Sequence, residues 1–213
     1  MCDIFEHYLD LLDVNEQSAV NCMIFPNDNA LRTAKKEMIG KKVIKKYDLI
    51  NRIFPENTGF RKVSSKKLQK CGCDYEVFFD DKSIYLDLKS LVGEDYDMKD
   101  KDYRDGLEHD NQGKKGIVLE IYQNGIFTNV NKLTDFFIYT ICDKDGISYC
   151  VISYKKVVEI CKKYIIHMGV VPVNEYTMYQ SNNGTGLYIK YPIIPKKIAT
   201  YEGKAVKTVR KEQ

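Results

Sequence analysis

Several features that would classify the chain quickly are missing from its sequence. No apolar run approaches the roughly 18 residues of a membrane-spanning helix. The first ten residues, MCDIFEHYLD, are acidic and lack the pattern of a secretory signal peptide. The formal net charge is only +3 over 213 residues, so charge alone does not indicate a nucleic-acid-binding protein. We therefore expect no membrane segment and no export by a signal peptide.

The residues of two common kinds of site are also missing. Cys71 and Cys73 form a Cys-x-Cys pair, but no second cysteine or histidine pair stands where it would complete a zinc site. The three histidines are isolated from one another in the sequence. The segment SNNGTG (181–186) has glycines but lacks the lysine and the following helix of a phosphate-binding loop. These patterns disfavour a structural zinc site and a nucleotide-binding loop.

The seven cysteines are odd in number and irregularly spaced. That pattern is typical of reduced thiols rather than of a disulfide framework. We therefore expect an intracellular protein in a reducing compartment. This is the cytoplasm, or the host cytoplasm if the protein is viral.

The apolar content is sufficient for a substantial core. Hydrophobic residues make up 44% of the chain and aromatic residues 12%, and 213 residues suit one domain of moderate size. Helical and strand-like patterns alternate without an internal repeat or a clear linker, which predicts an α+β domain. The patterns predict helices over 1–24, from Asn27 to about Ile53, and over 155–165; strands over 59–63, 74–79, 83–90, 116–123, 134–141 and 147–154; an acidic loop over 93–113; and a largely irregular end with one more strand.

One short stretch, CDYEVFFDDKSIYLDLKS (73–90), carries the strongest chemical signal. It is predicted to form a hairpin of two strands. Because strand side chains alternate between faces, Asp87 and Lys89 lie on one side of the sheet. A turn near Asp80–Lys82 would bring Asp74 back beside Asp87. The stretch therefore places two carboxylates and one ammonium group together.

This combination suits the hydrolysis of phosphodiester bonds with a divalent metal. Carboxylate oxygens are the ligands that Mg²⁺ prefers, and Mn²⁺ is expected to substitute for it. The metal stabilises charge on the phosphate and lowers the pKa of a bound water. A lysine on the same face can orient the attacking water or neutralise the transition state. We predict Asp74, Asp87 and Lys89 as catalytic residues, with Asp74 and Asp87 as metal ligands.

The same residues resemble the PD-(D/E)xK nuclease superfamily, whose fold occurs in many restriction endonucleases, resolvases and phage exonucleases. The resemblance covers about residues 30–165 and implies a restriction endonuclease-like core, with a central mixed β-sheet flanked by α-helices. An acid-bearing helix precedes the hairpin in that family, and Glu37 in AKKEMIGKK matches it. Strands resembling the later ones of the family follow over 117–146. The remaining residues, 166–213, are then a C-terminal extension of a single domain spanning 1–213.

The resemblance also implies further metal ligands and departs from the family pattern at two positions. The acid of the upstream helix predicts Glu37 as an additional ligand. Some members also line the metal pocket with an acid on the next strand, which predicts Glu120 as another. Cys73 stands where the family often has proline, and the second acid is Asp rather than the commoner Glu. Both are permitted variants. Glu120 is equally well explained as a charged residue on a solvent-facing side of its strand.

Lysines gather in clusters that would suit a phosphodiester substrate. The pair Lys41 and Lys42 lies in the predicted second helix, and Lys66 and Lys67 precede the hairpin. Acids concentrate instead in the segment 93–113. We predict that these four lysines bind nucleic acid, although lysines also serve to solvate helix faces.

Together these patterns favour a Mg²⁺-dependent endonuclease that acts on DNA. An RNA endonuclease of the same fold is the alternative, since viral cap-cleaving nucleases resemble the same hairpin. Those enzymes typically add a histidine on the upstream helix, and ALRTAKKEM has none. A third reading is a non-catalytic protein that kept the fold and binds nucleic acid or a protein partner. Nucleases of this kind that cut both strands often dimerise, so a homodimer is a further possibility.

Overall fold

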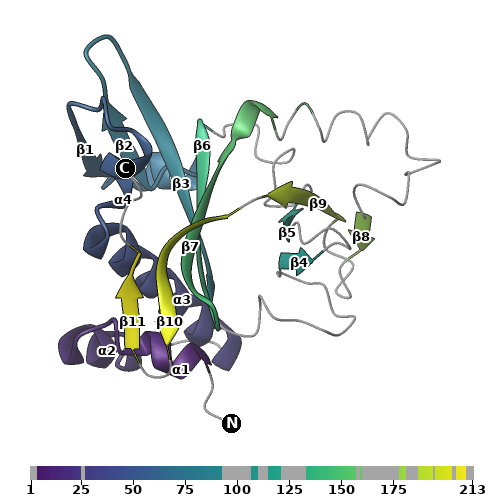
Figure 1. Cartoon of the computed structure of the whole chain (residues 1–213). Coiled ribbons are helices and arrows are strands. Elements are labelled where there is room, and N and C mark those ends of the chain that lie inside the picture. Colours follow the sequence, from purple (N-terminus) through teal and green to yellow (C-terminus); the bar gives the residue numbers. More distant parts are fainter. Residues whose placement is uncertain are drawn as a thin grey trace.

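In a computed structural model the chain folds around a seven-stranded mixed sheet (Figure 1). The strands lie in the order β1-β2-β3-β6-β7-β10-β11. Neighbouring strands are antiparallel except β3 and β6, which are parallel. The strands are β1 (Gly59–Lys62), β2 (Tyr75–Phe78), β3 (Ser83–Val92), β6 (Phe136–Asp143), β7 (Gly146–Ser153), β10 (Lys196–Glu202) and β11 (Ala205–Thr208).

The structure describes most of the chain that forms this sheet and its helices. The described residues are 4–24, 27–92, 107–109, 115–120, 133–156, 159, 178–180, 187–193, 195–202 and 205–209.

Helices cover one side of the main sheet, and a four-stranded sheet lies on its other side in Figure 1. The helices are α1 (Ile4–Leu9), α2 (Val14–Asn21), α3 (Asp28–Lys46), α4 (Leu49–Ile53) and α5 (Lys66–Lys70). The smaller sheet has the order β4-β5-β9-β8 and consists of β4 (Leu107–His109), β5 (Lys115–Glu120), β8 (Met178–Gln180) and β9 (Leu187–Ile193). The predicted α+β class with a mixed sheet is confirmed.

The N-terminal segment forms two helices, so the prediction of one helix over 1–24 is wrong. The Asp13 carboxylate accepts a hydrogen bond from the Glu16 N–H, and the Glu16 carboxylate accepts one from the Asp13 N–H, both at 2.9 Å. This capping box begins a new helix at Val14. The apolar spacing that predicted one helix therefore continues across a helix start.

The helix predicted to run to about Ile53 is likewise interrupted. Asn27 caps α3 as expected, because its side chain accepts a hydrogen bond from the Ala30 N–H at 2.9 Å. At Asp48 the backbone adopts φ 49°, a left-handed conformation that ends the helical run before α4 begins. The prediction misses this break because Asp48 carries no proline or glycine signal.

Helix α3 packs closely against the central strand β3. Ile39 and Val43 of the helix share one apolar core with Leu86 and Leu88 of the strand. A Cβ at Gly40 would lie 1.7 Å from the Ser90 hydroxyl oxygen, so any side chain there would push the helix away. The close contact fixes the polar residues of α3 relative to β3.

The C-terminal part of the chain contributes more to the fold than the sequence predicts. The expectation was irregular structure with one more strand, and four are present, of which β10 and β11 extend the main sheet. The strand β4 lies within the predicted loop 93–113, whose other residues lie outside the described part. The helix predicted over 155–165 also lies largely outside it.

Candidate active site

The predicted hairpin is present, and it is formed by β2 and β3. Tyr75 pairs with Leu86, and the Phe79 N–H donates to the Lys82 carbonyl at 2.8 Å to close the turn. At the opposite, open end, the Asp74 N–H donates to the Leu86 carbonyl at 2.8 Å. The register therefore places Asp74 beside Asp87.

The Asp74 carboxylate is held by the backbone of the neighbouring strand. Its Oδ2 atom accepts a hydrogen bond from the Leu88 N–H at 2.8 Å. The β2–β3 ladder ends at Tyr75 and Leu86, so this carboxylate satisfies an N–H that no ladder bond from β2 reaches. The bond fixes the carboxylate at the point where the two strands separate.

Asp87 and Lys89 project to the side of β3 away from α3. Leu88, between them, belongs to the core beneath the helix. Asp87 is 3% exposed, whereas the Lys89 side chain is 46% exposed. The Lys89 Nζ lies 2.9 Å from the Asp87 Oδ1, which is a direct ion pair. One buried carboxylate is thus bound by a lysine that remains accessible to solvent.

The electrostatics of the three groups are coupled. Burial raises the pKa of Asp74 above its usual value; the Leu88 hydrogen bond opposes this, and the charge of Asp87 adds to it. Burial acts to lower the pKa of Lys89, but the charge and hydrogen bond of Asp87 outweigh it and leave that pKa raised. Two carboxylates next to one ammonium leave one negative charge when all are ionised. A cation beside Asp74 would relieve the unfavourable burial of its charge.

Two residues of α3 lie near this centre without entering it. Glu37 and Lys41 form an ion pair at 3.5 Å, and the Glu37 side chain is 60% exposed. The negative charge of Glu37 contributes to the raised pKa of Lys89, and Lys41 contributes a lowering effect on the pKa of Asp74. Across the described residues, no three His, Cys, Asp or Glu side chains group closely enough to hold a metal. A metal here would therefore have two protein carboxylates, with Glu37 at the periphery.

Glu120, the other predicted ligand, lies in a different sheet. It is the last residue of β5, which pairs with β4 and β9. Its side chain is outside the described part of the structure, so the predicted role in metal binding stays a prediction.

The predicted nucleic-acid-binding residues Lys66 and Lys67 flank the open end of the hairpin. They form the first turn of α5, which Ser65 caps and which ends four residues before Asp74. Both side chains are exposed. Two exposed cations therefore stand in the helix that precedes Asp74.

The segment between α5 and Asp74 is anchored by residues that the sequence did not single out as site residues. The Thr134 hydroxyl, which is buried, donates a short hydrogen bond to the Gly72 carbonyl. The Asp135 carboxylate accepts a hydrogen bond from the Tyr85 N–H at 2.7 Å. These bonds fix both strands of the hairpin to the start of β6. The Thr-Asp pair just before an apolar strand was the available signal.

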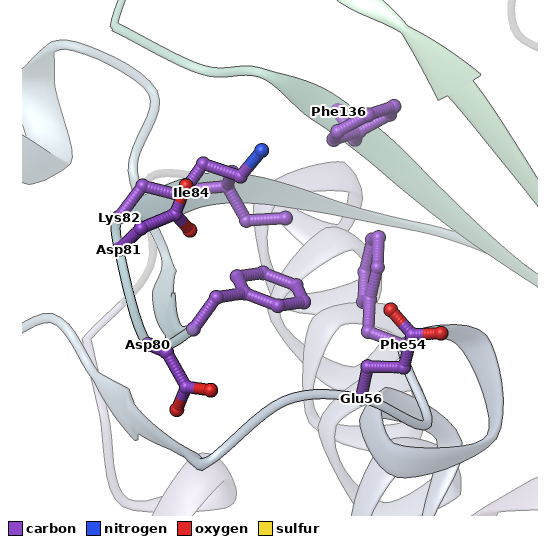
Figure 2. A pocket seen from close by; sticks show the side chains of 8 residues that line it. Phe54, Glu56, Asp80, Asp81, Lys82, Ile84 and Phe136 are labelled. Carbon is purple, nitrogen blue, oxygen red and sulfur yellow. The ribbon is translucent and has the colours of Figure 1, made fainter.

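The turn end of the hairpin forms a separate hollow of about 420 Å³ (Figure 2). Phe54 contacts Phe79 edge-on at 6.2 Å and Phe136 at 5.7 Å between ring centroids. The acids Asp80 and Asp81 lie on its rim and are exposed. This hollow combines aromatic walls with an acidic rim, and it contains none of the predicted site residues.

A larger hollow of about 600 Å³ lies between α3 and the strands β1 and β2. We call it the basic groove. Its lining includes Tyr75, the residue after Asp74. It also includes Lys41, whose charge acts to lower the pKa of Asp74. Its residues are Glu16, Met38, Lys41, Lys42, Ile44, Lys45, Asp48, Phe60, Arg61, Lys62 and Tyr75.

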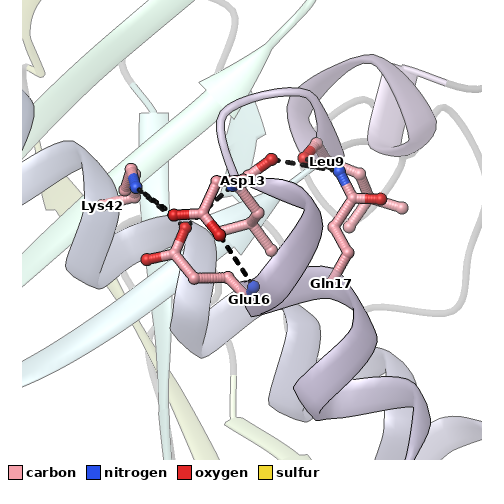
Figure 3. Close-up of polar contacts among 6 residues, drawn as sticks. Leu9, Asp13, Glu16, Gln17 and Lys42 are labelled. Carbon is pink, nitrogen blue, oxygen red and sulfur yellow. Dashed lines mark hydrogen bonds and ion pairs between the residues drawn. The ribbon is translucent and has the colours of Figure 1, made fainter.

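Lys42, predicted to bind nucleic acid, is held within this groove by α2 (Figure 3). Its Nζ lies 2.8 Å from the Glu16 carboxylate and 3.7 Å from the Asp13 carboxylate. The hydrogen bond that Lys42 donates to Glu16 raises the pKa of Lys42, and burial opposes this only in part. Lys42 therefore joins two helices, and a nucleic-acid phosphate would have to compete with these acids for it.

Comparison of the chain with known protein families, with curated proteins and with solved structures finds no match. Among the described helices, none is long and apolar enough to cross a membrane.

Proposed function

We propose that the chain is a Mg²⁺-dependent endonuclease that hydrolyses phosphodiester bonds of DNA at Asp74, Asp87 and Lys89. The observation that carries this proposal is the open end of the hairpin. There, two carboxylates from adjacent strands lie side by side, and a lysine two residues along binds one of them at 2.9 Å.

The donor set fits a hard divalent cation. Asp74 and Asp87 supply carboxylate oxygens, which Mg²⁺ and Mn²⁺ both accept, and Mg²⁺ commonly keeps water for its remaining positions. The pKa of Asp74 is raised because its carboxylate is buried and lies beside the charge of Asp87, so its ionised form is disfavoured without a cation. When bound, the metal would stabilise charge on the phosphate and supply an acidic water.

The side chains of the protein have separable tasks in this proposal. Asp74 is oriented by the Leu88 N–H and so presents a fixed carboxylate edge. Lys89 keeps nearly half of its side chain in solvent while bound to Asp87, so its ammonium can reach a phosphate at the site. Its raised pKa keeps it protonated near neutral pH, which suits a group that stabilises the negative charge of the transition state.

The arrangement around the site supports a restriction endonuclease-like core. The acid-bearing helix α3 precedes the hairpin, packs on β3, and brings Glu37 within electrostatic reach of Lys89. The strand β6 then adds parallel to β3. The absence of histidine from α3 supports DNA over RNA within this proposal.

Incubation of the protein with supercoiled plasmid, linear DNA and RNA tests this function. Cleavage products are expected with Mg²⁺ or Mn²⁺, mainly from DNA, and none in EDTA. Ca²⁺ is expected to bind without supporting turnover. Full cleavage in EDTA would exclude the metal mechanism, and cleavage of RNA alone would change the substrate.

A further inference from the structure

The basic groove combines a concentrated positive charge with an aromatic surface. Five of its lining residues are cations, Lys41, Lys42, Lys45, Arg61 and Lys62, and two, Glu16 and Asp48, are acids. The groove has a volume of about 600 Å³, within the range of about 300–1,000 Å³ typical of ligand sites. Charge and shape therefore both suit an extended anion.

Some cations of the groove form ion pairs with acids of the protein, and others do not. Lys42 is bound by Glu16, and the Arg61 guanidinium donates through Nε and Nη2 to the Glu76 carboxylate at 2.9 and 2.7 Å. Lys45 and Lys62 are exposed, and neither forms an ion pair with any described residue. These two lysines line the groove from different elements, α3 and β1, and are available to a ligand.

The aromatic surface is formed by two residues of the β1–β2 pair. Phe60 is 41% exposed, although it is a large apolar side chain on a strand. Its ring meets that of Tyr75 edge-on, with 6.5 Å between centroids. An exposed ring between cations, as Phe60 provides, suits an unpaired base, because every base can stack on an aromatic ring.

We infer that the basic groove binds a single-stranded stretch of nucleic acid that leads to the cleavage site. Phosphates contact Lys45 and Lys62, and one base stacks on Phe60. The inference rests on the proposed function for the cleavage site but names a binding surface that is separate from Asp74, Asp87 and Lys89. It predicts that the preferred substrate is single-stranded, or is a duplex with an unpaired segment beside the scissile bond.

An unpaired strand fits these observations better than an intact duplex or an acidic peptide. In a duplex the base faces are stacked on one another and cannot reach Phe60. An acidic peptide would use the lysines but has no need of an exposed ring. Tyr75 lines the groove and directly follows Asp74, and because consecutive strand residues face opposite sides of a sheet, the bound strand would pass around the open end of the hairpin to reach the carboxylates.

Fluorescence anisotropy in EDTA, where the proposed reaction cannot proceed, measures this binding without cleavage. The probes are a labelled oligothymidine, an abasic oligomer of the same length, and a matched duplex. The oligothymidine is expected to bind at least about tenfold more tightly than the abasic oligomer, the scale of one stacked base. Equal binding of the two oligomers, or tighter binding of the duplex, would overturn the inference.

The variant Phe60→Ala isolates the stacking contact. It is expected to weaken oligothymidine binding by about tenfold and to change abasic binding by less than about twofold. Phe60→Tyr should restore binding, and Met23→Ala, which truncates another exposed apolar side chain, should leave it unchanged. If Phe60→Ala weakens both oligomers equally, or neither, the base does not stack there.

The double variant Lys45→Ala/Lys62→Ala isolates the phosphate contacts. The slope of log affinity against log salt for oligothymidine should fall by about 1.4, the value for two contacts to a single strand. Lys155→Ala/Lys156→Ala removes two exposed lysines outside the groove and should leave the slope unchanged. Equal slopes in both variants would overturn the assignment. So would equal competition by a poly-glutamate of the same charge, because the groove would then be an unspecific polyanion site.

These binding results are independent of catalysis. Binding as described, with no cleavage under any metal condition, would refute the proposed nuclease and leave the single-strand site standing. Metal-dependent cleavage with no preference for bases in the groove would do the reverse.

Discussion

The two ends of one hairpin carry pairs of aspartates in opposite surroundings. At the turn of β2 and β3, Asp80 and Asp81 are exposed on the rim of an aromatic hollow. At the open end, Asp74 is partly buried, and Asp87 is 3% exposed and bound to Lys89. A solvated carboxylate costs a fold little, whereas a buried one costs several kcal/mol unless it is paired. The burial of Asp74 and Asp87 therefore needs a functional or structural reason, whereas the exposed Asp80 and Asp81 need none.

The surrounding charges sharpen the contrast. Towards the open end, α5 carries Lys66 and Lys67, and the basic groove has five cations against two acids. The hollow at the turn end is lined by three acids, Glu56, Asp80 and Asp81, and one cation, Lys82. We therefore expect a polyanion to prefer the end that holds the candidate site. The variants of Asp87 and Lys89 each have a matched variant of the same residue type at the turn end.

The largest expected effect is that of Asp87→Asn. Removing this carboxylate should lower the rate of DNA cleavage about a thousandfold or more, because it removes a metal ligand and leaves Lys89 without its partner. The matched variant Asp81→Asn should cleave at the wild-type rate. Gel assays of plasmid cleavage compare the two, and equal losses would mean that the two ends do not differ in function.

Lys89→Ala should lose about a hundredfold in rate, the scale of one lost transition-state contact. Its affinity for Mg²⁺, measured by titration calorimetry, should stay within a few-fold of the wild type. The control is Lys82→Ala, a lysine of the turn end. Normal cleavage by Lys89→Ala would show that this lysine only neutralises Asp87.

Lys66→Ala/Lys67→Ala tests the cations of α5 beside the open end. For duplex DNA, the slope of log affinity against log salt should fall by about 1.8 if both lysines contact phosphates. Asp80→Asn/Asp81→Asn should leave that slope unchanged, because these acids touch no phosphate. An unchanged slope in the lysine variant would mean that α5 is a solvated helix face.

The smallest expected effect is on stability. Asp74→Asn should raise the free energy of unfolding at pH 7 by on the order of 1 kcal/mol, since it removes a buried charge while an amide oxygen can still accept from Leu88. The pKa of Asp74 is raised in the folded state, so the wild type gains stability as pH falls through that pKa. The advantage of the variant should therefore close at low pH in urea-unfolding curves. A variant less stable than the wild type at pH 7 would show that Lys89 and Lys41 overcompensate the burial.

The hairpin could be predicted from local signals, and so could its chemical residues. The strand alternation that separates Leu88 from Asp87 and Lys89 is a property of any strand. Two features could not be predicted. The break at Asp48 depends on the backbone conformation of one residue. The addition of β10 and β11 to the main sheet depends on pairing between segments that are distant in the sequence.

The candidate site shows the same division. The spacing of Asp74 and Asp87 predicts their pairing across the turn. The Thr-Asp pair before β6 marks Thr134 in the sequence, but it does not predict that the Thr134 hydroxyl binds the Gly72 carbonyl. The basic groove could not be predicted either. It depends on the position of α3 beside β1 and β2, which places Lys45 and Lys62 in the lining of one hollow although they come from separate elements.

The most direct measurement is the position of a bound metal. Crystals soaked in Mn²⁺ and measured near the manganese absorption edge would give an anomalous difference peak for each bound ion. A peak is expected between the carboxylates of Asp74 and Asp87, at roughly 2.0–2.3 Å from an oxygen of each. A peak only at Asp80 and Asp81, or none at the open end at saturating Mn²⁺, would contradict a metal-dependent active site there.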